Sequence, residues 1–373
     1  MKKGLILILI ISLLTSLVGC SGAKYEPVPS TEEESTVVMT LKYGQDSYDV
    51  KYELYRAMFL TYKDEISRGD DSVWNGADKD EYIEEINELI IDRISEIYSV
   101  FAICKKIGFD LFSREVDREI ERYITESVEG GSGAIGYGSY EKYLEALADK
   151  NLNYSVQDLL YRYAIGLEAI DEHYIGTFDA DDITNTIIFG NIKYTKDDVR
   201  EFYFSDDCVR MLRAYVQYNA HFEPMQYAKT VRDRMIEAAE SGESAVATVI
   251  INTGLTAATE VQRGYVIGEY SMDALYYSEL TEAAFDLEIG EVSEPVTVHN
   301  GDEKIIFIVY CAEKNTENFE DLYSEIAYVY LTNEVGRIMD EASDVLSDNV
   351  SFSDAFRGLD YSSIRMNNET AQN

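Results

Sequence analysis

One long apolar stripe limits what this chain can fold into. Between residues 78 and 106, large apolar side chains recur at intervals of three or four residues, at Ile83, Ile86, Ile90, Ile94, Ile97 and Phe101. Such intervals place side chains on one face of an α-helix, and Gly108 then provides a stop signal. The stripe predicts a helix over 78–106 that other elements must cover, which favours a helical domain with its own core.

Weaker patterns surround this stripe. A first strand is predicted over 36–43, and further helices are predicted over 48–67, after Ser113, and over 140–150, 156–174 and 196–203. Two helix starts carry a hydroxyl side chain three residues before an acid, a capping pattern: Ser155 with Asp158, and Thr195 with Asp198. The glycine-rich residues 130–138 lack the order of a phosphate-binding loop, so we expect a flexible connection there.

Beyond residue 207 the pattern changes to a mixture of strand and helix. The predicted elements are a strand over 212–219, a helix over 224–240, a hairpin of 292–298 with 305–310, and a returning helix over 317–346. Residues after 350 are polar and are expected to fray. The predicted fold class is therefore α+β, mainly helical, with an α+β domain inserted before the returning helix.

The charge balance excludes one class of function. Lys and Arg number 32 against 70 Asp and Glu, a net charge of 32 − 70 = −38. Proteins that bind DNA or RNA through phosphates need a basic face, so nucleic acid is excluded as a partner. Four cysteines and three histidines predict neither a disulfide scaffold nor a metal site, and no cofactor is expected. Cys104, Cys208 and Cys311 are expected to be free, buried thiols.

The N-terminal residues predict a cellular location. Residues 1–20 read MKKGLILILIISLLTSLVGC, in which two lysines precede an apolar run that is too short to span a membrane. The small residues before Cys20 resemble the lipobox of bacterial lipoproteins. This resemblance implies a lipid attached at Cys20 and a place on the extracytoplasmic face of the bacterial cell membrane; an ordinary signal peptide with a chance cysteine is the alternative. Residues 21–35 are predicted to be a flexible tether.

A sixteen-residue stretch closely resembles the parvulin-type peptidyl-prolyl isomerases. Residues 281–296 read TEAAFDLEIGEVSEPV. Parvulins carry a helix of the form F-E-x-A-A-F-x-L followed by x-x-G-E-V-S-x-P-V, with the same spacing from helix to strand. Residues 264–268 and 304–309 look like two flanking strands of that family.

The helical remainder resembles the chaperone domain of PrsA- and SurA-like foldases. The similarity lies in residues 139–144 with Leu147 and in residues 154–159. In that family an isomerase domain is inserted between N-terminal helices and a returning C-terminal helix. The implied organisation is a lipoprotein signal peptide at 1–20, a tether at 21–35, a helical SurA/PrsA-like chaperone domain at 36–207, a parvulin-like domain at 208–314, a returning helix at 315–350 and a polar tail at 351–373.

The parvulin resemblance also implies a proline pocket, formed by Val216, Tyr276, Leu280, Phe285 and Lys304. Two histidines support this pocket in parvulins, and Val216 and Lys304 stand at their positions here. Tyr276, Leu280 and Phe285 fall on the apolar gripping positions, although Leu280 and Phe285 are also explained as core residues under the sheet, the interpretation that we favour for Phe285. Isomerisation needs no covalent step, only a pocket that favours the twisted amide.

Two other features depart from the parvulin pattern. The histidines that are present, His173, His221 and His299, do not align with the two family positions and are expected at the surface or in turns. Residues 244–253 are β-branched where the family has a polar helix.

Together the resemblances imply a membrane-anchored extracytoplasmic foldase or chaperone that binds unfolded or partly folded secreted polypeptides. Whether it is a peptidyl-prolyl isomerase stays open at this point, because both family histidines are replaced. One alternative is a binding-only chaperone with no isomerase activity. Another, of a different class, is the solute-binding lipoprotein of a transporter, although the sequence shows neither two repeated α/β lobes nor a doubly wound βαβ pattern.

Overall fold

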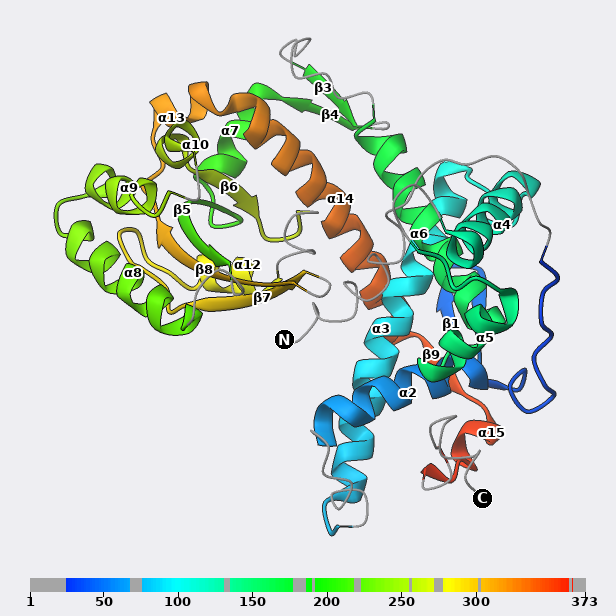
Figure 1. Ribbon diagram of the computed structural model, residues 1–373. Coiled ribbons are helices and arrows are strands. Elements are labelled where there is room, and N and C mark those ends of the chain that lie inside the picture. The colour runs from blue at the N-terminus through cyan, green and yellow to red at the C-terminus, as the bar shows by residue number, and fades with distance from the viewer. Residues whose placement is uncertain are drawn as a thin grey trace. The chain divides into compact units, whose positions relative to one another are not determined.

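The chain forms two compact units. The computed structural model describes residues 25–67, 76–130, 135–176, 186–189, 192–217, 223–254, 257–271, 278–300, 303–361 and 364. We call residues 171–337 the sheet unit, and residues 25–170 together with 338–364 the helical unit (Figure 1). Helices predominate and the sheets are small and antiparallel, which confirms the α+β class. In the part of the chain that the structure describes, no helix is both long and apolar enough to cross a membrane.

A three-stranded sheet opens the helical unit, with the order β2-β1-β9. The strands are β1 (Val37–Tyr43), β2 (Asp46–Lys51) and β9 (Val350–Phe352). Gly44, with φ +60, forms the tight turn between β1 and β2. Residues 48–51, predicted as the start of a helix, are therefore strand, because they pair with β1 across this turn.

Besides the short α15 (Asp354–Arg357), the described residues of this unit contain four whole helices, most of a fifth and the end of a sixth. They are α2 (Tyr52–Ser67), α3 (Lys79–Ile107), α4 (Arg114–Glu129), α5 (Tyr140–Asp149), α6 (Tyr154–Tyr174) and α14 (Tyr323–Asp348). The division between the units falls within α6 and within α14. The prediction for α3 is confirmed: Ile86, Ile90, Ile94 and Ile97 are fully buried, and Gly108 ends the helix in the left-handed conformation.

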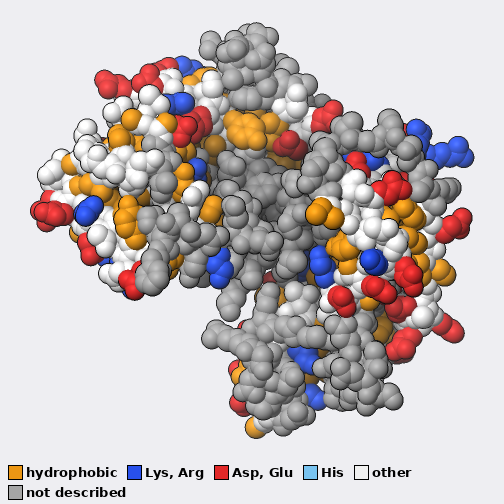
Figure 2. All heavy atoms as spheres, in the orientation of Figure 1, with side chains coloured by type: hydrophobic (Ala, Val, Ile, Leu, Met, Phe, Trp, Pro, Cys, Tyr) orange, Lys and Arg blue, Asp and Glu red, His pale blue; other side chains and the backbone are white. Residues whose placement is uncertain are grey.

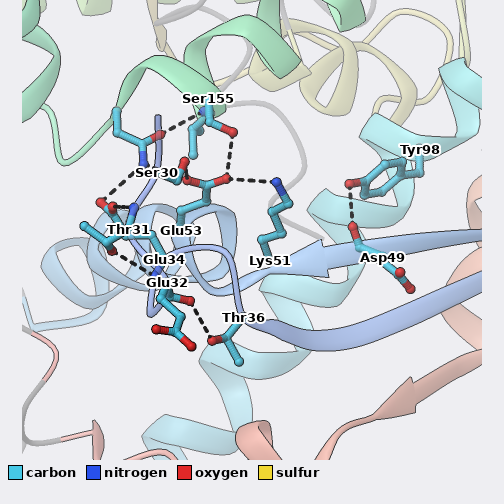
Figure 3. A network of polar contacts seen from close by, with 12 residues as sticks. Ser30, Thr31, Glu32, Glu34, Thr36, Asp49, Lys51, Glu53, Tyr98 and Ser155 are labelled. Atoms are coloured by element: carbon cyan, nitrogen blue, oxygen red, sulfur yellow. Dashed lines mark hydrogen bonds and ion pairs between the residues drawn. The ribbon is translucent and has the colours of Figure 1, made fainter. Parts of the chain in front are cut away.

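The segment predicted as a flexible tether is partly fastened to the helical unit. Tyr25 stacks on Tyr140 of α5 with ring centroids 4.8 Å apart, and the Tyr140 hydroxyl donates to the Glu26 carbonyl (2.7 Å). Further along, the Ser30 hydroxyl donates to the buried carboxylate of Glu53 on α2 (Figure 3). Residues 25–35 therefore belong to the folded unit, because aromatic and polar side chains give them fixed partners.

The start of α6 differs from the predicted capping pair. Asn153 caps the helix instead, since the Val156 N–H donates to its side-chain oxygen (2.9 Å). Ser155 donates its hydroxyl to Glu53 (2.6 Å), and Asp158 forms an ion pair with Arg162 (2.8 Å). The prediction was wrong because Glu53, distant in the sequence, takes the hydroxyl of Ser155, and Arg162, one turn further along α6, takes the carboxylate of Asp158.

The residues expected to fray after 350 are partly folded. β9 pairs with β1, and the short helix α15 (Asp354–Arg357) follows it. The rings of Phe352 and Phe356 stack with centroids 4.4 Å apart, and Phe356 meets the ring of Tyr55 edge-on at 5.5 Å. These aromatic contacts hold residues 350–357 on the helical unit.

The sheet unit is built on a four-stranded antiparallel sheet with the order β6-β5-β8-β7. Its strands are β5 (Cys208–Gln217), β6 (Tyr265–Gly268), β7 (Val296–Asn300) and β8 (Glu303–Cys311), so the predicted hairpin around residues 299–302 is confirmed. One face is covered by α8 (Pro224–Ala239), α9 (Glu243–Ile251) and α10 (Ala258–Arg263), and the opposite face by α12 (Ser278–Phe285). The β-branched residues of α9 are helical because Val246, Ala247 and Ile250 pack on the sheet.

The remaining elements of this unit lie beside α14. They are the hairpin of β3 (Thr186–Phe189) with β4 (Ile192–Thr195), α7 (Lys196–Phe204) and α13 (Thr316–Asp321). Thr195 and Asp198 form the predicted capping box at the start of α7. The structure has two helices where the sequence predicted one over 317–346. The first, α13, ends at Asp321 with Leu322 as its C-cap, and α14 begins at Tyr323.

On the face of the molecule drawn in Figure 2, the acidic side chains do not gather in one place. Figure 2 shows Asp and Glu side chains spread over the face in view, with Lys and Arg side chains standing singly or in small groups among them. On this face the negative charge is therefore spread over the surface, where it repels acidic partners.

Candidate functional site

The stretch 281–296 folds into the end of α12, a turn and the start of β7. Gly290 in the turn has φ +92, a conformation that favours glycine, and its N–H donates to a carbonyl at the end of β8 (2.9 Å). The Ser293 N–H donates to the Val309 carbonyl (2.8 Å), and the Val309 N–H donates to the Ser293 hydroxyl (3.0 Å). These residues therefore fasten the connection to β8 and hold α12 against the sheet.

The structure separates the residues of the expected proline pocket. Val216 on β5 is fully buried on the face covered by α8 and α9, among residues such as Val231. Leu280 and Phe285 belong to α12, which packs on the opposite face of the sheet. Lys304 is exposed on β8, and its backbone pairs with that of His299 on β7.

Tyr276 lies outside the described residues, as does His221, and His173 stands at the end of α6 beside Tyr174. The structure therefore brings Leu280 and Phe285 together but does not place Val216 with them. Because the Val216 side chain faces α8 and α9, it lies in the core on that side of the sheet and does not contribute to a pocket on the α12 face.

A cluster that sequence reasoning missed lies on the α12 face. We call Arg213, Tyr215, Tyr265 and Phe307 the aromatic cluster. The guanidinium carbon of Arg213 lies 4.0 Å from the ring centroid of Tyr265 and 5.6 Å from that of Phe307. The rings of Tyr215 and Phe307 are 6.4 Å apart. The same face carries Leu280, buried beneath, and Phe285, which is half-buried.

The polar groups of the aromatic cluster interact with one another and with their neighbours. Arg213 is half-buried and forms no ion pair with any carboxylate in the described part of the chain. Burial raises the pKa of the Tyr265 phenol, so its hydroxyl stays protonated at neutral pH and donates to Glu260 (3.4 Å). The sequence contained one signal for this cluster: in a strand over 209–217, the odd-numbered side chains share one face of the sheet. The sequence does not show which of the two faces that is.

This arrangement suits binding more than covalent chemistry. A guanidinium has five N–H donors, so Arg213 can stack on the ring of Tyr265 and still donate to carbonyl oxygens or carboxylates. The half-buried rings of Tyr215 and Tyr265 give apolar side chains a contact area at a small cost in conformational entropy. An extended peptide offers both kinds of group at once, so the α12 face has the chemistry of a peptide-binding surface.

The cysteines are poor candidates for nucleophiles. Cys104, Cys208 and Cys311 are free and buried, which confirms the prediction. Burial raises the pKa of the Cys104 and Cys208 thiols to about 12 and also raises that of Cys311, so all three are protonated at neutral pH. Across the ranges that the structure describes, no group of three or more His, Cys, Asp or Glu side chains is placed to hold a metal ion.

The chain was compared with known protein families, curated proteins and solved structures. No family model matches the chain, and no curated protein matches it. It is similar to the solved structures of the foldase PrsA from Streptococcus pneumoniae (11% identity, 85% of this chain and 97% of that chain, TM-score 0.22) and from Lactococcus lactis (15%, 86% and 96%, 0.23). A third is the peptidylprolyl isomerase PrsA from Bacillus anthracis (14%, 71% and 100%, 0.24).

Proposed function

We propose that this chain is a membrane-anchored extracytoplasmic foldase that binds unfolded or partly folded secreted polypeptides. One observation carries the proposal: the aromatic cluster lies on the sheet face that is covered by α12, the helix of the parvulin-like stretch. A cation held over an aromatic ring, beside half-buried apolar side chains, matches the backbone carbonyls and side chains of an unfolded chain. The proposed location rests on the lipobox-like residues before Cys20.

Binding, rather than isomerase chemistry, is the activity that the described side chains favour. An X–Pro bond isomerises over a barrier of about 20 kcal/mol, and catalysis needs a pocket that grips the ring while the amide twists. Val216 is buried on the face of the sheet opposite to α12, and Lys304 is exposed. The two positions of the family histidines therefore do not flank Leu280. We therefore propose a chaperone-type foldase, with acceleration of prolyl isomerisation as the contrasting outcome of the test.

The test uses the mature chain without lipid, residues 21–373. We expect it to suppress aggregation of a reduced, unfolded client protein and to bind a labelled fragment of that client. Arg213→Ala should weaken binding about tenfold, since it removes the cation and its donors. Arg234→Ala is the matched control, because Arg234 is exposed on α8, on the other side of the sheet.

Two results would contradict the proposal. If the chain neither suppresses aggregation nor binds the fragment, it is not a chaperone. If a protease-coupled assay with a proline-containing peptide shows a rate well above the uncatalysed one, the chain is an isomerase and the binding-only mechanism is wrong. Lipid attachment is tested separately, since Cys20→Ser should release the protein from the membrane fraction.

A further inference from the structure

A groove of about 480 Å³ lies in the helical unit, between the first half of α3 and the C-terminal elements. Its volume is within the range of about 300–1,000 Å³ that is usual for ligand sites. The apolar and amide side chains that line it are Ile83, Asn87, Ile91, Phe352, Phe356 and Tyr361. All belong to the helical unit, so the groove is complete within that unit.

The floor of the groove offers apolar contact and little else. Phe352 and Phe356 stack on each other, and Ile83 is only 8% exposed. The polar group at the floor, Asn87, is already engaged: its side-chain oxygen accepts from the Tyr55 hydroxyl (2.6 Å), and its side-chain nitrogen donates to the Tyr361 hydroxyl (3.4 Å). A ligand would therefore gain from burying apolar side chains here.

The rim of the groove is acidic. Asp80, Glu84 and Glu88 line it and are exposed, and their spacing of four residues places them on one side of α3. None of the three forms an ion pair with a residue that the structure describes. Lys79 is the single basic residue among those that line the groove. The rim therefore presents a row of carboxylates that a basic ligand can neutralise.

The spacing of this row fits an extended chain. Four residues of an α-helix rise about 6 Å, and alternate residues of an extended chain are about 6.6 Å apart. Cations at alternate positions of an extended peptide can therefore each meet one carboxylate, while the residues between them turn toward the floor. From Asp80 to Ile91 the helix rises about 16 Å, which spans about five extended residues.

We propose that this groove binds an extended polypeptide segment in which Lys or Arg alternates with apolar or aromatic residues. The inference rests on the proposed function and gives it a second contact with the client, of a defined sequence class. Charge complementarity supports this occupant, because the rim repels acidic segments and the whole chain carries a net charge of −38.

The experiment measures fluorescence anisotropy with the mature chain, residues 21–373. One labelled probe has the core Lys-Phe-Lys-Leu-Lys, and a second replaces each lysine by glutamate. In the rim variant the three carboxylates become amides: Asp80→Asn, Glu84→Gln and Glu88→Gln. The matched control makes the same change in charge on the same helix, at exposed residues that do not line the groove: Glu81→Gln, Glu85→Gln and Asp92→Asn.

We expect the lysine probe to bind the unmodified chain, and the rim variant to bind it about tenfold more weakly, while the control changes affinity less than about twofold. The glutamate probe should not bind, and added salt should weaken the lysine probe's binding because the rim is exposed.

Three outcomes would overturn the inference. They are no binding of the lysine probe, equal loss of binding in the rim variant and its control, and binding that appears only after residues 365–373 are deleted. The last would identify the chain's own C-terminal residues as the occupant. If the chain still suppresses aggregation and only Arg213→Ala weakens client binding, the proposed function stands and this inference fails.

Discussion

Ser155 donates its hydroxyl to Oε1 of Glu53 across 2.6 Å, which joins the start of α6 to the start of α2. The same carboxylate accepts from Asn153 (2.8 Å) and from Ser30, and Glu53 is only 5% exposed (Figure 3). Its donors come from two segments more than a hundred residues apart in the chain. One buried carboxylate therefore fixes how the N-terminal segment, α2 and α6 meet.

Removing that carboxylate should destabilise the helical unit. Glu53→Ala leaves three donors without their acceptor, and we expect a loss of about 3 kcal/mol in the free energy of unfolding. Glu53→Gln keeps one acceptor oxygen and should cost less. Urea denaturation followed by circular dichroism measures both, with the exposed Glu33→Ala as control, expected within about 0.5 kcal/mol. A Glu53→Ala variant as stable as this control would show that the network contributes nothing.

Gly166 should tolerate no side chain, although it lies inside α6. A Cβ at this position would lie 2.5 Å from Cγ1 of Val100 and 3.2 Å from the Cys104 sulfur on α3. Alanine favours helix over glycine by about 1 kcal/mol, but the collision reverses this gain, so we expect Gly166→Ala to destabilise by about 1–3 kcal/mol. Gly358→Ala is the control, since its nearest atoms are 3.5 Å away. A stabilising Gly166→Ala would show that α3 and α6 can separate freely.

The capping box of α7 should make the stability of the folded protein depend on pH. Hydrogen bonds from the hydroxyl and the backbone N–H of Thr195 hold the pKa of Asp198 below its ordinary value. A carboxyl whose pKa is lowered by folding stabilises the fold above its unfolded pKa, near 4, and this contribution is lost as the pH falls through the folded pKa.

Asp198→Asn should therefore lower the Tm by about 2 °C at neutral pH and by much less in acid. Asp197→Asn, in the same helical turn, is the control for the helix dipole. Thermal scans at about pH 7 and pH 3 measure both variants, and a pH-independent effect of Asp198→Asn would contradict the role of its charge.

The thiols should be unreactive in the native protein. Because burial raises the pKa of Cys104 and Cys208 to about 12, their thiolate fraction at about pH 8 is very small. In residues 21–373 we expect no labelling by a thiol-specific reagent within minutes, and labelling of all three cysteines in denaturant. Rapid labelling of one cysteine in native buffer would mean that its surroundings open readily.

Local patterns predicted local structure well. The stripe from Ile83 to Phe101 predicted α3 because apolar residues at helical spacing form the buried face of a helix. Ser113 and Thr195 cap their helices as expected. Ser155 did not, because its partner Glu53 is far away in the sequence.

The local sequence did not show which face of the sheet each strand side chain occupies. Nearly every residue from Met211 to Val216 is apolar or long, so alternation does not show which set faces α12. The register decides it: Val216 stands opposite Ile306 and Tyr215 opposite Phe307, and this pairing joins strands about ninety residues apart. The aromatic cluster therefore became visible only once β5 and β8 were paired.

Because β9 pairs with β1, the two units of a chain that emerges N-terminus first cannot complete their folding at the same time. Residues 171–337 form a contiguous unit, which can fold as soon as it has emerged. The helical unit must wait, because one edge of its sheet stays open until residues 350–352 arrive to cover β1. Until then the helical unit presents an uncovered strand edge, the kind of surface with which strands of other chains can pair.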